Sequence, residues 1–202
     1  MKKRTFITVI IALLIMILPI KASAANTHTV VRGDSLWRIA VKYEVGLSEI
    51  INANPQIKTP DLIYPGDLIS IPKADPTTRA YESEVIRLVN IERSKNGLSP
   101  LIEDWQVSRV ARYKSQDMRD RGYFSHTSPT YGSPFQMLKS FGISYRSAGE
   151  NIAKGYKSPA AVVDGWMNSS GHRANILNPS FTHIGVGYEK DGSYWTQMFI
   201  SK

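Results

Sequence analysis

The hydrophobic pattern separates a short N-terminal part of the chain from a longer C-terminal part. In the N-terminal part, the β-rich run THTVVR precedes two runs, LWRIAVKY and LSEIINAN, whose apolar residues recur at helical spacing. Asp34 or Ser35 can cap the first helix, Pro55 stops the second, and a Pro-Gly turn precedes a final strand. The pattern predicts a small βααβ unit over residues 26–72.

The C-terminal part begins with helical patterns and ends with a hairpin pattern. Two β-rich runs flank Asp191-Gly192, which is a strong hairpin signal. This order favours an α+β layered domain over residues 81–202. The stretch before it is rich in Pro and Thr and predicts a linker at 73–80. Helices are predicted in four runs: YESEVIRLVNIERSKNG, EDWQVSRVARYKSQDMRDRG, PFQMLKSFG and SPAAVVDGWMN.

The first 24 residues have the pattern of a secretory signal peptide. A basic start, Lys2 to Arg4, precedes an apolar run at 6–18, and small residues at 22 and 24 predict cleavage after Ala24. The alternative is an uncleaved membrane anchor, but the run is shorter than the ~20 residues that a bilayer span needs. We therefore expect export, with no membrane span after cleavage.

Charge and cysteine content narrow the classes of function. Cleavage lowers the formal net charge from +8 to +4, because residues 1–24 hold four basic residues and no acidic ones. The remaining basic residues are interleaved with acidic ones, which argues against a nucleic-acid-binding face and fits a weak attraction to an anionic cell wall. The chain has no cysteine, so packing alone must hold the fold.

The N-terminal part resembles a LysM module over nearly its whole length. The resemblance rests on the motifs GDSLW, NANP and YPGD. It implies binding of N-acetylglucosamine-containing glycans such as peptidoglycan or chitin. In so small a core Leu36 and Ile63 could instead be purely structural, and we expect Trp37 to be a core residue. The implied glycan-binding groove comprises Gly33, Asp34, Ser35, Leu36, Leu62, Ile63 and Tyr64.

Three histidines and one isolated glutamate carry the candidate chemistry of the C-terminal part. His126 lies in a predicted loop, and Glu150 is isolated in the apolar run AGENIA. Gly171 can adopt a positive φ and end a helix, so that His172 starts the next one, where the helix dipole favours a neutral imidazole. Such an imidazole can act as a base or a metal ligand. His183 is expected to be structural or at the rim of a cleft.

The segments FSH, GENIA, GWMNSSGHRANIL, IGVGY and YWTQMF together resemble the CAP superfamily, also called SCP or PR-1-like, over residues 81–200. The resemblance implies an α-β-α sandwich and a cleft with two histidines and two acidic residues. His126, Glu150 and His172 match these positions directly. Ser169 stands where many relatives have a glutamate, and serine is a poor zinc ligand and no carboxylate.

Two hypotheses of function follow. The favoured one is a non-enzymatic protein of the cell wall or spore envelope. Its LysM module binds peptidoglycan, its CAP cleft binds a ligand or a cell-wall or spore-coat protein, and it requires no cofactor. The spore location follows from a resemblance of NPQIKTPDLIYPGDLISIP to modules of spore-coat assembly proteins.

The alternative is a metal-dependent hydrolase acting on wall or protein substrates. His126, Glu150 and His172 would then hold zinc or another divalent metal and activate a water. Cleavage of a glycosidic bond by two carboxylates is disfavoured, because Ser169 removes the second one.

Overall fold

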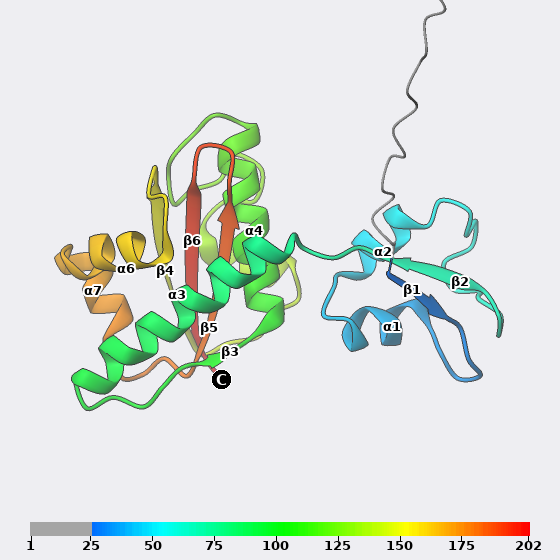
Figure 1. Cartoon of the computed structure of the whole chain (residues 1–202), viewed down its shortest axis with the longest axis horizontal. Coiled ribbons are helices and arrows are strands. Elements are labelled where there is room, and N and C mark those ends of the chain that lie inside the picture. Colours follow the sequence, from blue (N-terminus) through cyan, green and yellow to red (C-terminus); the bar gives the residue numbers. More distant parts are fainter. Residues whose placement is uncertain (1–25) are drawn as a thin grey trace, which may run out of the picture.

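The computed structural model describes residues 26–202, which form two lobes joined by a short connection (Figure 1). The predicted signal peptide at 1–24 lies outside the described residues. The smaller lobe, the N-terminal module, has the predicted βααβ order, and its two strands pair antiparallel with His28 opposite Ile69. Its elements are β1 Asn26–Thr29, α1 Leu36–Lys42, α2 Leu47–Ala53 and β2 Leu68–Ile71.

A single hydrophobic core holds the N-terminal module together. Leu36 and Ile39 of α1, Ile50 of α2 and Ile69 of β2 are at most 2% exposed. The prediction that Trp37 belongs to this core is wrong, because the residue is 62% exposed. Consecutive helical residues point about 100° apart, so the inward position of Leu36 turns Trp37 toward solvent.

The buried Asn54 explains the asparagine-rich motif after α2. Its side-chain nitrogen donates to the carbonyls of Ile50 and Ser70, and its side-chain oxygen accepts from the backbone N–H of Ser70. One amide thereby closes the end of α2 and ties it to β2. Because the residue is only 1% exposed, replacing it would leave backbone groups unpaired in the core.

Residues 72–75 connect β2 to α3, Pro76–Lys95, the first helix of the larger lobe. Asp75 caps α3 by accepting hydrogen bonds from the backbone N–H groups of Thr77 and Thr78. Pro76 occupies the first turn, where it loses no helical hydrogen bond. The predicted linker at 73–80 is therefore too long, since residues 76–80 are helical despite their Pro and Thr content.

The larger lobe, the C-terminal domain, places a four-stranded sheet between two layers of helices (Figure 1). The strand order is β3-β5-β6-β4, with β3 parallel to β5 and the other pairs antiparallel. Helices α4 and α5 cover one face, and α3, α6 and α7 cover the other, as expected for an α-β-α sandwich. The bounds are β3 Ile102–Glu103, α4 Trp105–Asp120, α5 Pro134–Ser140, β4 Ser147–Lys154, α6 Pro159–Met167, α7 Ser170–Ile176, β5 His183–Glu189 and β6 Tyr194–Ser201.

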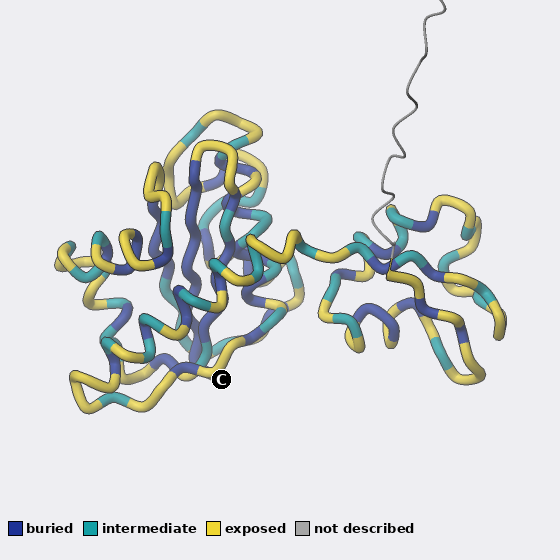
Figure 2. Tube along the Cα trace, in the orientation of Figure 1, coloured by how far each residue is buried: buried dark blue, intermediate teal, exposed yellow. Residues whose placement is uncertain are grey.

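Successive side chains of the central strands point to opposite faces of the sheet and so contribute to a hydrophobic core on each face. Ile184 and Phe199 pack beneath α3, α6 and α7, whereas Met198 and Ile200 pack beneath α4 and α5. The eight residues of β6 are all buried (Figure 2). None of the helices in residues 26–202 is long and apolar enough to cross a membrane.

Strand β4 was not predicted, because its sequence lacks alternation and residues 150–153 are buried in succession. It lies at the edge of the sheet, with β6 as its strand neighbour. The carbonyls of Glu150 and Ile152 accept hydrogen bonds from the side chains of Asn175 and Trp166. Helices α6 and α7 therefore supply the partners that a further strand would otherwise provide.

Helix α4 lies close to β5 because two glycines face it. A Cβ on Gly185 would lie 2.2 Å from the backbone nitrogen of Ser108, and one on Gly187 would lie 2.2 Å from the carbonyl carbon of Ala111. The Ser115 hydroxyl uses this proximity to donate to the carbonyl of Gly187 at 3.0 Å. Glycine is required at these two positions for space, since neither has a positive φ.

Replacing Gly187 by alanine should lower the free energy of unfolding by about 1–3 kcal/mol, because the new methyl group would overlap the backbone of α4. Gly171→Ala is the matched control, since a Cβ there meets nothing within 4 Å and alanine favours the helix. Urea denaturation of both variants measures the difference. Equal midpoints would contradict the close approach.

Candidate functional site

A buried carboxylate on β4 and an exposed histidine from a loop form the centre of the candidate site. His126 Nδ1 lies 2.7 Å from Glu150 Oε1. Burial raises the pKa of Glu150, and the hydrogen bond to His126 and the charge of Lys114 offset this only in part. The hydrogen bond to Glu150 raises the pKa of His126. Within residues 26–202, the second oxygen of Glu150 has no hydrogen-bond partner.

The loop that carries His126 is held by a lysine in the middle of α4. The Nζ of Lys114 donates to the carbonyls of Ser125 and His126, both at 2.8 Å, and to the hydroxyl of Tyr123 at 3.1 Å. Lys114 is only 1% exposed, and this burial lowers its pKa. The three acceptors satisfy a charge that would otherwise be costly to bury. Lys114 thus fixes the backbone of His126 beside β4.

Asp117, one turn further along α4, holds the other half of the same loop. Its carboxylate accepts hydrogen bonds from the hydroxyl groups of Tyr123, Ser128 and Thr130. Burial opposes its ionisation, but these hydrogen bonds outweigh that effect and lower its pKa. The sequence reasoning missed both Lys114 and Asp117. Their signal was a pair of charged residues on the inward face of an amphipathic helix, beside Ala111 and Met118.

His172 reaches the site from α7, but not in the predicted way. Gly171 does not have a positive φ and lies inside α7, which begins at Ser170 with Ser169 as its N-cap residue. The preceding helix ends at Met167 without help from a glycine. Burial, followed by the charge of His126, lowers the pKa of His172. A lowered pKa favours the neutral imidazole that we expected, but its main cause is burial and not the helix dipole.

A buried amide network holds α7 against β4. Asn151 donates to the carbonyl of His172 at 3.1 Å and to the side chain of Gln197 at 3.0 Å. Asn175 donates to the side chain of Asn151 at 2.9 Å. At the far end of α7, the buried Arg93 donates to the carbonyls of Ile176 and Asn178 and so fixes the chain that follows. The position of His172 is therefore set by packing and amide hydrogen bonds that the sequence analysis did not identify.

The predicted cleft residues come together only in part. His126 and Glu150 are in contact. His172 is linked to this pair through charge, since the charge of His126 contributes to the lowered pKa of His172. Ser169 makes no side-chain cap hydrogen bond on α7. His183, expected to be structural or at the rim, lies at the start of β5 and pairs with the hydroxyl of Thr182.

A preformed metal site is not part of this arrangement. Within the described part of the chain, no three His, Cys, Asp or Glu side chains are grouped to hold a metal ion. His126, Glu150 and His172, the predicted ligands, therefore do not present three ligands to one point.

The predicted glycan-binding residues of the N-terminal module have different surroundings. Leu36 is 2% exposed and belongs to the core, so its side chain does not face a glycan. Asp34 accepts hydrogen bonds from His28 Nε2 at 2.7 Å and from the backbone of Val31, and Ser35 caps α1. Gly33 has a φ of 94° in the turn before α1, a backbone conformation that favours glycine.

The second half of the predicted groove exposes apolar side chains. Leu62 is 53% exposed and Tyr64 is 59% exposed, whereas Ile63 packs against the core. Leu62 and Tyr64 line a pocket of about 360 Å³ together with Ile57 and Leu68. The same pocket is also lined by Gln56, Lys58, Thr59 and Asp67. An aromatic ring and apolar side chains can cover the face of a sugar and its acetamido group, while polar side chains beside them can bond its hydroxyl groups.

Comparison with protein families agrees with both halves of the chain. A family model described as the Cysteine-rich secretory protein family, CAP, matches residues 86–199, which is more than half of the chain. The chain belongs to this family. A LysM domain model matches residues 28–72, so the N-terminal module is a LysM module and the C-terminal domain is a CAP domain. Despite the family's description, this CAP domain contains no cysteine.

Two curated relatives from Bacillus species match different shares of the chain. The uncharacterized protein YkwD of Bacillus subtilis is 64% identical over 129 residues, which cover 64% of this chain and 50% of YkwD. The chain thus spans about half the length of that relative. Spore coat assembly protein ExsA of Bacillus cereus is 47% identical over 45 residues, covering 22% of this chain and 7% of ExsA.

A solved structure shows the CAP fold directly. The crystal structure of an extracellular protein containing an SCP domain from Bacillus anthracis is similar with a TM-score of 0.61 and 37% identity. The match covers 68% of this chain and 47% of that one. The sandwich of the CAP domain is therefore one that a homologous chain adopts in a crystal.

Replacing Glu150 by glutamine should lower the pKa of His126 toward its ordinary value of 6.5, because the negative charge that favours the imidazolium is removed while the side-chain shape is kept. A pH titration followed by the NMR signals of the histidine rings measures this shift. The His183 signal serves as the internal control, because its ring lies on β5 and pairs with Thr182. An unchanged His126 titration would contradict the pairing.

Proposed function

We propose that this protein binds an N-acetylglucosamine-containing glycan, peptidoglycan in the first place, through its LysM module and presents the CAP domain as a binding unit without catalysis. The observation that carries the proposal is the LysM module with Leu62 and Tyr64 exposed in a pocket of mixed polar and apolar lining. Carbohydrate recognition of this kind needs exposed aromatic and apolar surface next to free backbone polar groups.

The CAP domain contributes a site in which one carboxylate oxygen of Glu150 has no hydrogen-bond partner among residues 26–202. The unpaired oxygen of Glu150 is buried beside an imidazole that is itself half exposed. An unpaired buried acceptor is costly and is relieved by a ligand that donates a hydrogen bond. A hydroxyl or amide group of a wall polymer or of a partner protein has this chemistry. We propose binding of such a donor at Glu150, with His126 and His172 at its rim.

The location we propose is the cell wall or the spore envelope of the exporting cell, reached through the signal peptide at 1–24. Support comes from the LysM module and from the likeness to a protein that is named for spore coat assembly. Wall or spore-coat proteins are then the partners that the CAP domain would meet.

The hydrolase alternative gains no observation in its favour. Ser169 supplies no second carboxylate, and the three predicted metal ligands do not form one group. The His126–Glu150 pair alone resembles a base with its orienting carboxylate, but no nucleophile stands beside it among the contacts of the described residues.

Replacing Tyr64 by alanine should weaken binding to purified peptidoglycan about tenfold, since loss of a well-placed aromatic contact typically costs more than 1 kcal/mol. Trp37→Ala is the matched control, because Trp37 is as exposed as Tyr64 but lies on α1 outside the predicted groove. Co-sedimentation over a range of peptidoglycan concentrations measures both. If only Trp37→Ala lost binding, the glycan would lie on α1 instead.

Incubation of the protein with peptidoglycan, with and without added zinc, should release no soluble sugar or peptide fragments above the level given by His172→Ala. The reason is that the site offers neither a metal-ligand group nor a second carboxylate. Release of reducing ends or free amino groups is the measurement. Product formed by the native chain and lost in His172→Ala would contradict the binding-only proposal.

A further inference from the structure

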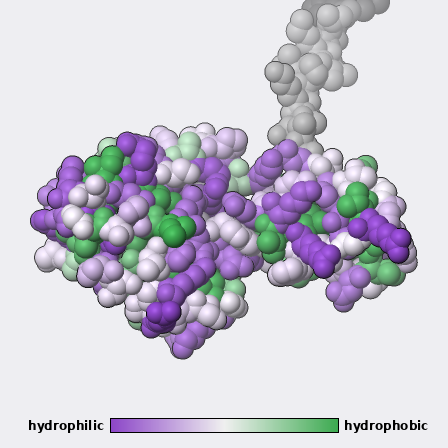
Figure 3. Space-filling model, turned by 90° about the horizontal axis from the view of Figure 1, so that it is seen from below, coloured by the Kyte–Doolittle hydropathy of each residue, from purple (hydrophilic) through white to green (hydrophobic). Residues whose placement is uncertain are grey.

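The LysM module and the CAP domain meet at a contact built from charged residues of both. The connection between them, residues 72–75, is too short to hold them far apart. A pocket of about 420 Å³ lies at the junction and is lined by residues from both modules, among them Tyr43, Glu49, Arg79 and Arg109. Seen from below, the surface where the two lobes meet is mainly hydrophilic (Figure 3).

The closest link across the junction is an arginine–glutamate pair in fork geometry. Arg109 Nε lies 2.7 Å from Glu49 Oε1, and Arg109 Nη2 lies 2.9 Å from Glu49 Oε2 and 3.1 Å from the hydroxyl of Ser48. Burial opposes the charge on Glu49, but the hydrogen bonds from Arg109 and Tyr113 and the charge of Arg109 together outweigh burial and lower the pKa of Glu49. Two parallel hydrogen bonds fix an angle as well as a distance.

The guanidinium of Arg109 is oriented by its own domain. It lies 5.3 Å from the ring centre of Tyr113 and 5.0 Å from that of Phe141, both in the CAP domain. Aromatic faces attract the cation and restrict its rotation. Arg109 is therefore held in position toward the LysM module, which reduces the entropy lost when it pairs with Glu49.

Gly46 of the LysM module provides the space for this guanidinium. It is buried and has a φ of −76°, so its backbone does not require glycine. A Cβ at this position would lie 2.2 Å from Arg109 Nε and 1.7 Å from Glu49 Oε2. A side chain at position 46 would therefore displace the paired ends of Glu49 and Arg109, so the glycine leaves room for the contact between the modules.

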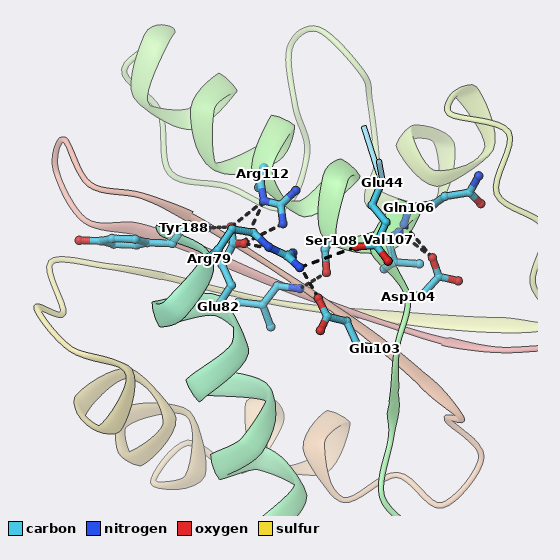
Figure 4. A network of polar contacts seen from close by, with 11 residues as sticks. Glu44, Arg79, Glu82, Glu103, Asp104, Gln106, Val107, Ser108, Arg112 and Tyr188 are labelled. Carbon is cyan, nitrogen blue, oxygen red and sulfur yellow. Dashed lines mark hydrogen bonds and ion pairs between the residues drawn. The ribbon is translucent and has the colours of Figure 1, made fainter. Parts of the chain in front are cut away.

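A second, looser pair supports the first (Figure 4). Arg79 lies 3.9 Å from Glu44 of the LysM module, and on its own side it contacts Glu103 at 3.3 Å. Glu44 has a φ of 53°, a left-handed conformation that usually favours glycine after a helix. A carboxylate is present there although the backbone disfavours it, and it faces a cation of the other domain.

We infer that these contacts make the two modules one rigid unit that turns the CAP site away from the glycan. The residues of the junction include none of the predicted groove residues, so the groove stays free. In Figure 1, β4 and α7, which carry Glu150 and His172, lie on the side of the CAP domain away from the LysM module. This orienting role rests on the proposed glycan binding, and it implies that the CAP ligand is not the strand held by the LysM module.

The test measures one distance across the junction in the full chain. Because the chain has no cysteine, Lys58→Cys and Lys190→Cys place one spin label on each module at exposed positions. Pulsed dipolar spectroscopy should give a single narrow distance distribution. Arg109→Glu should cause loss of the narrow peak, and the milder Glu49→Gln should broaden it.

Two further variants test whether the ion pair between Glu49 and Arg109 causes the narrow distance distribution. The double exchange Glu49→Arg with Arg109→Glu should largely restore the narrow peak, because the charges again attract. Arg87→Glu makes the same charge change at an exposed position of α3, where Glu84 is the ion-pair partner of Arg87 among residues 26–202, and should leave the peak unchanged. A broad distribution in the native chain, or a narrow one in Arg109→Glu, would overturn the inference.

Co-sedimentation with peptidoglycan separates this inference from the proposed function. Arg109→Glu should sediment as the native chain does, because the groove is untouched. If the native chain fails to sediment, the proposed function fails whatever the distances show. If Arg109→Glu alone fails to sediment, Arg109 takes part in glycan binding, and the purely orienting role is overturned.

Discussion

The close contact between α4 and β5 is the constraint on which the rest of the CAP domain depends. Gly185 and Gly187 place no side chain of their own between α4 and β5, so the backbone of α4 comes close to that strand and its position is fixed. A helix fixed in this way presents its residues in set directions. Its middle carries Lys114 and Asp117 to the His126 loop, and its first turns carry Arg109 to the LysM module.

Charged residues take over part of the role that disulfides have in many small domains, since this chain has no cysteine. Arg93 joins the end of α3 to the chain after α7, Lys114 joins α4 to a loop, and Glu82 joins α3 to Arg112 and to the backbone of β5. Each is buried and hydrogen-bonded to groups outside its own helix. Removing one partner of such a set is strongly destabilising, whereas an exposed ion pair contributes little.

Much of the fold could be predicted from local pattern, because helices with amphipathic spacing, proline starts and a Asp191-Gly192 turn leave strong signals. The LysM and CAP motifs gave the family and the residues His126, Glu150 and His172. Strand β4 was not predicted, because a strand buried on both faces does not alternate between apolar and polar residues. Trp37 was assigned to the core from its hydrophobicity, although the phase set by Leu36 turns it outward.

What local pattern could not give was the set of contacts between distant segments. Asn151 and Asn175 read as ordinary polar residues until the fold places them in one buried network under His172. Gly46 reads as a helix boundary, and only the positions of Glu49 and Arg109 show that a side chain there would meet the ion pair between the modules. Pairings of this kind depend on tertiary geometry, to which a single sequence gives no direct signal.

The closed edge of β4 has a consequence if the protein binds a repetitive polymer, as we propose. Many copies on neighbouring glycan units would be crowded together, a situation in which open sheet edges pair with one another and aggregate. Here the side chains of Asn175 and Trp166 occupy the edge carbonyls of β4, and β3 at the opposite edge is only two residues long. The domain can therefore be packed densely on a surface while each copy remains a separate folded unit.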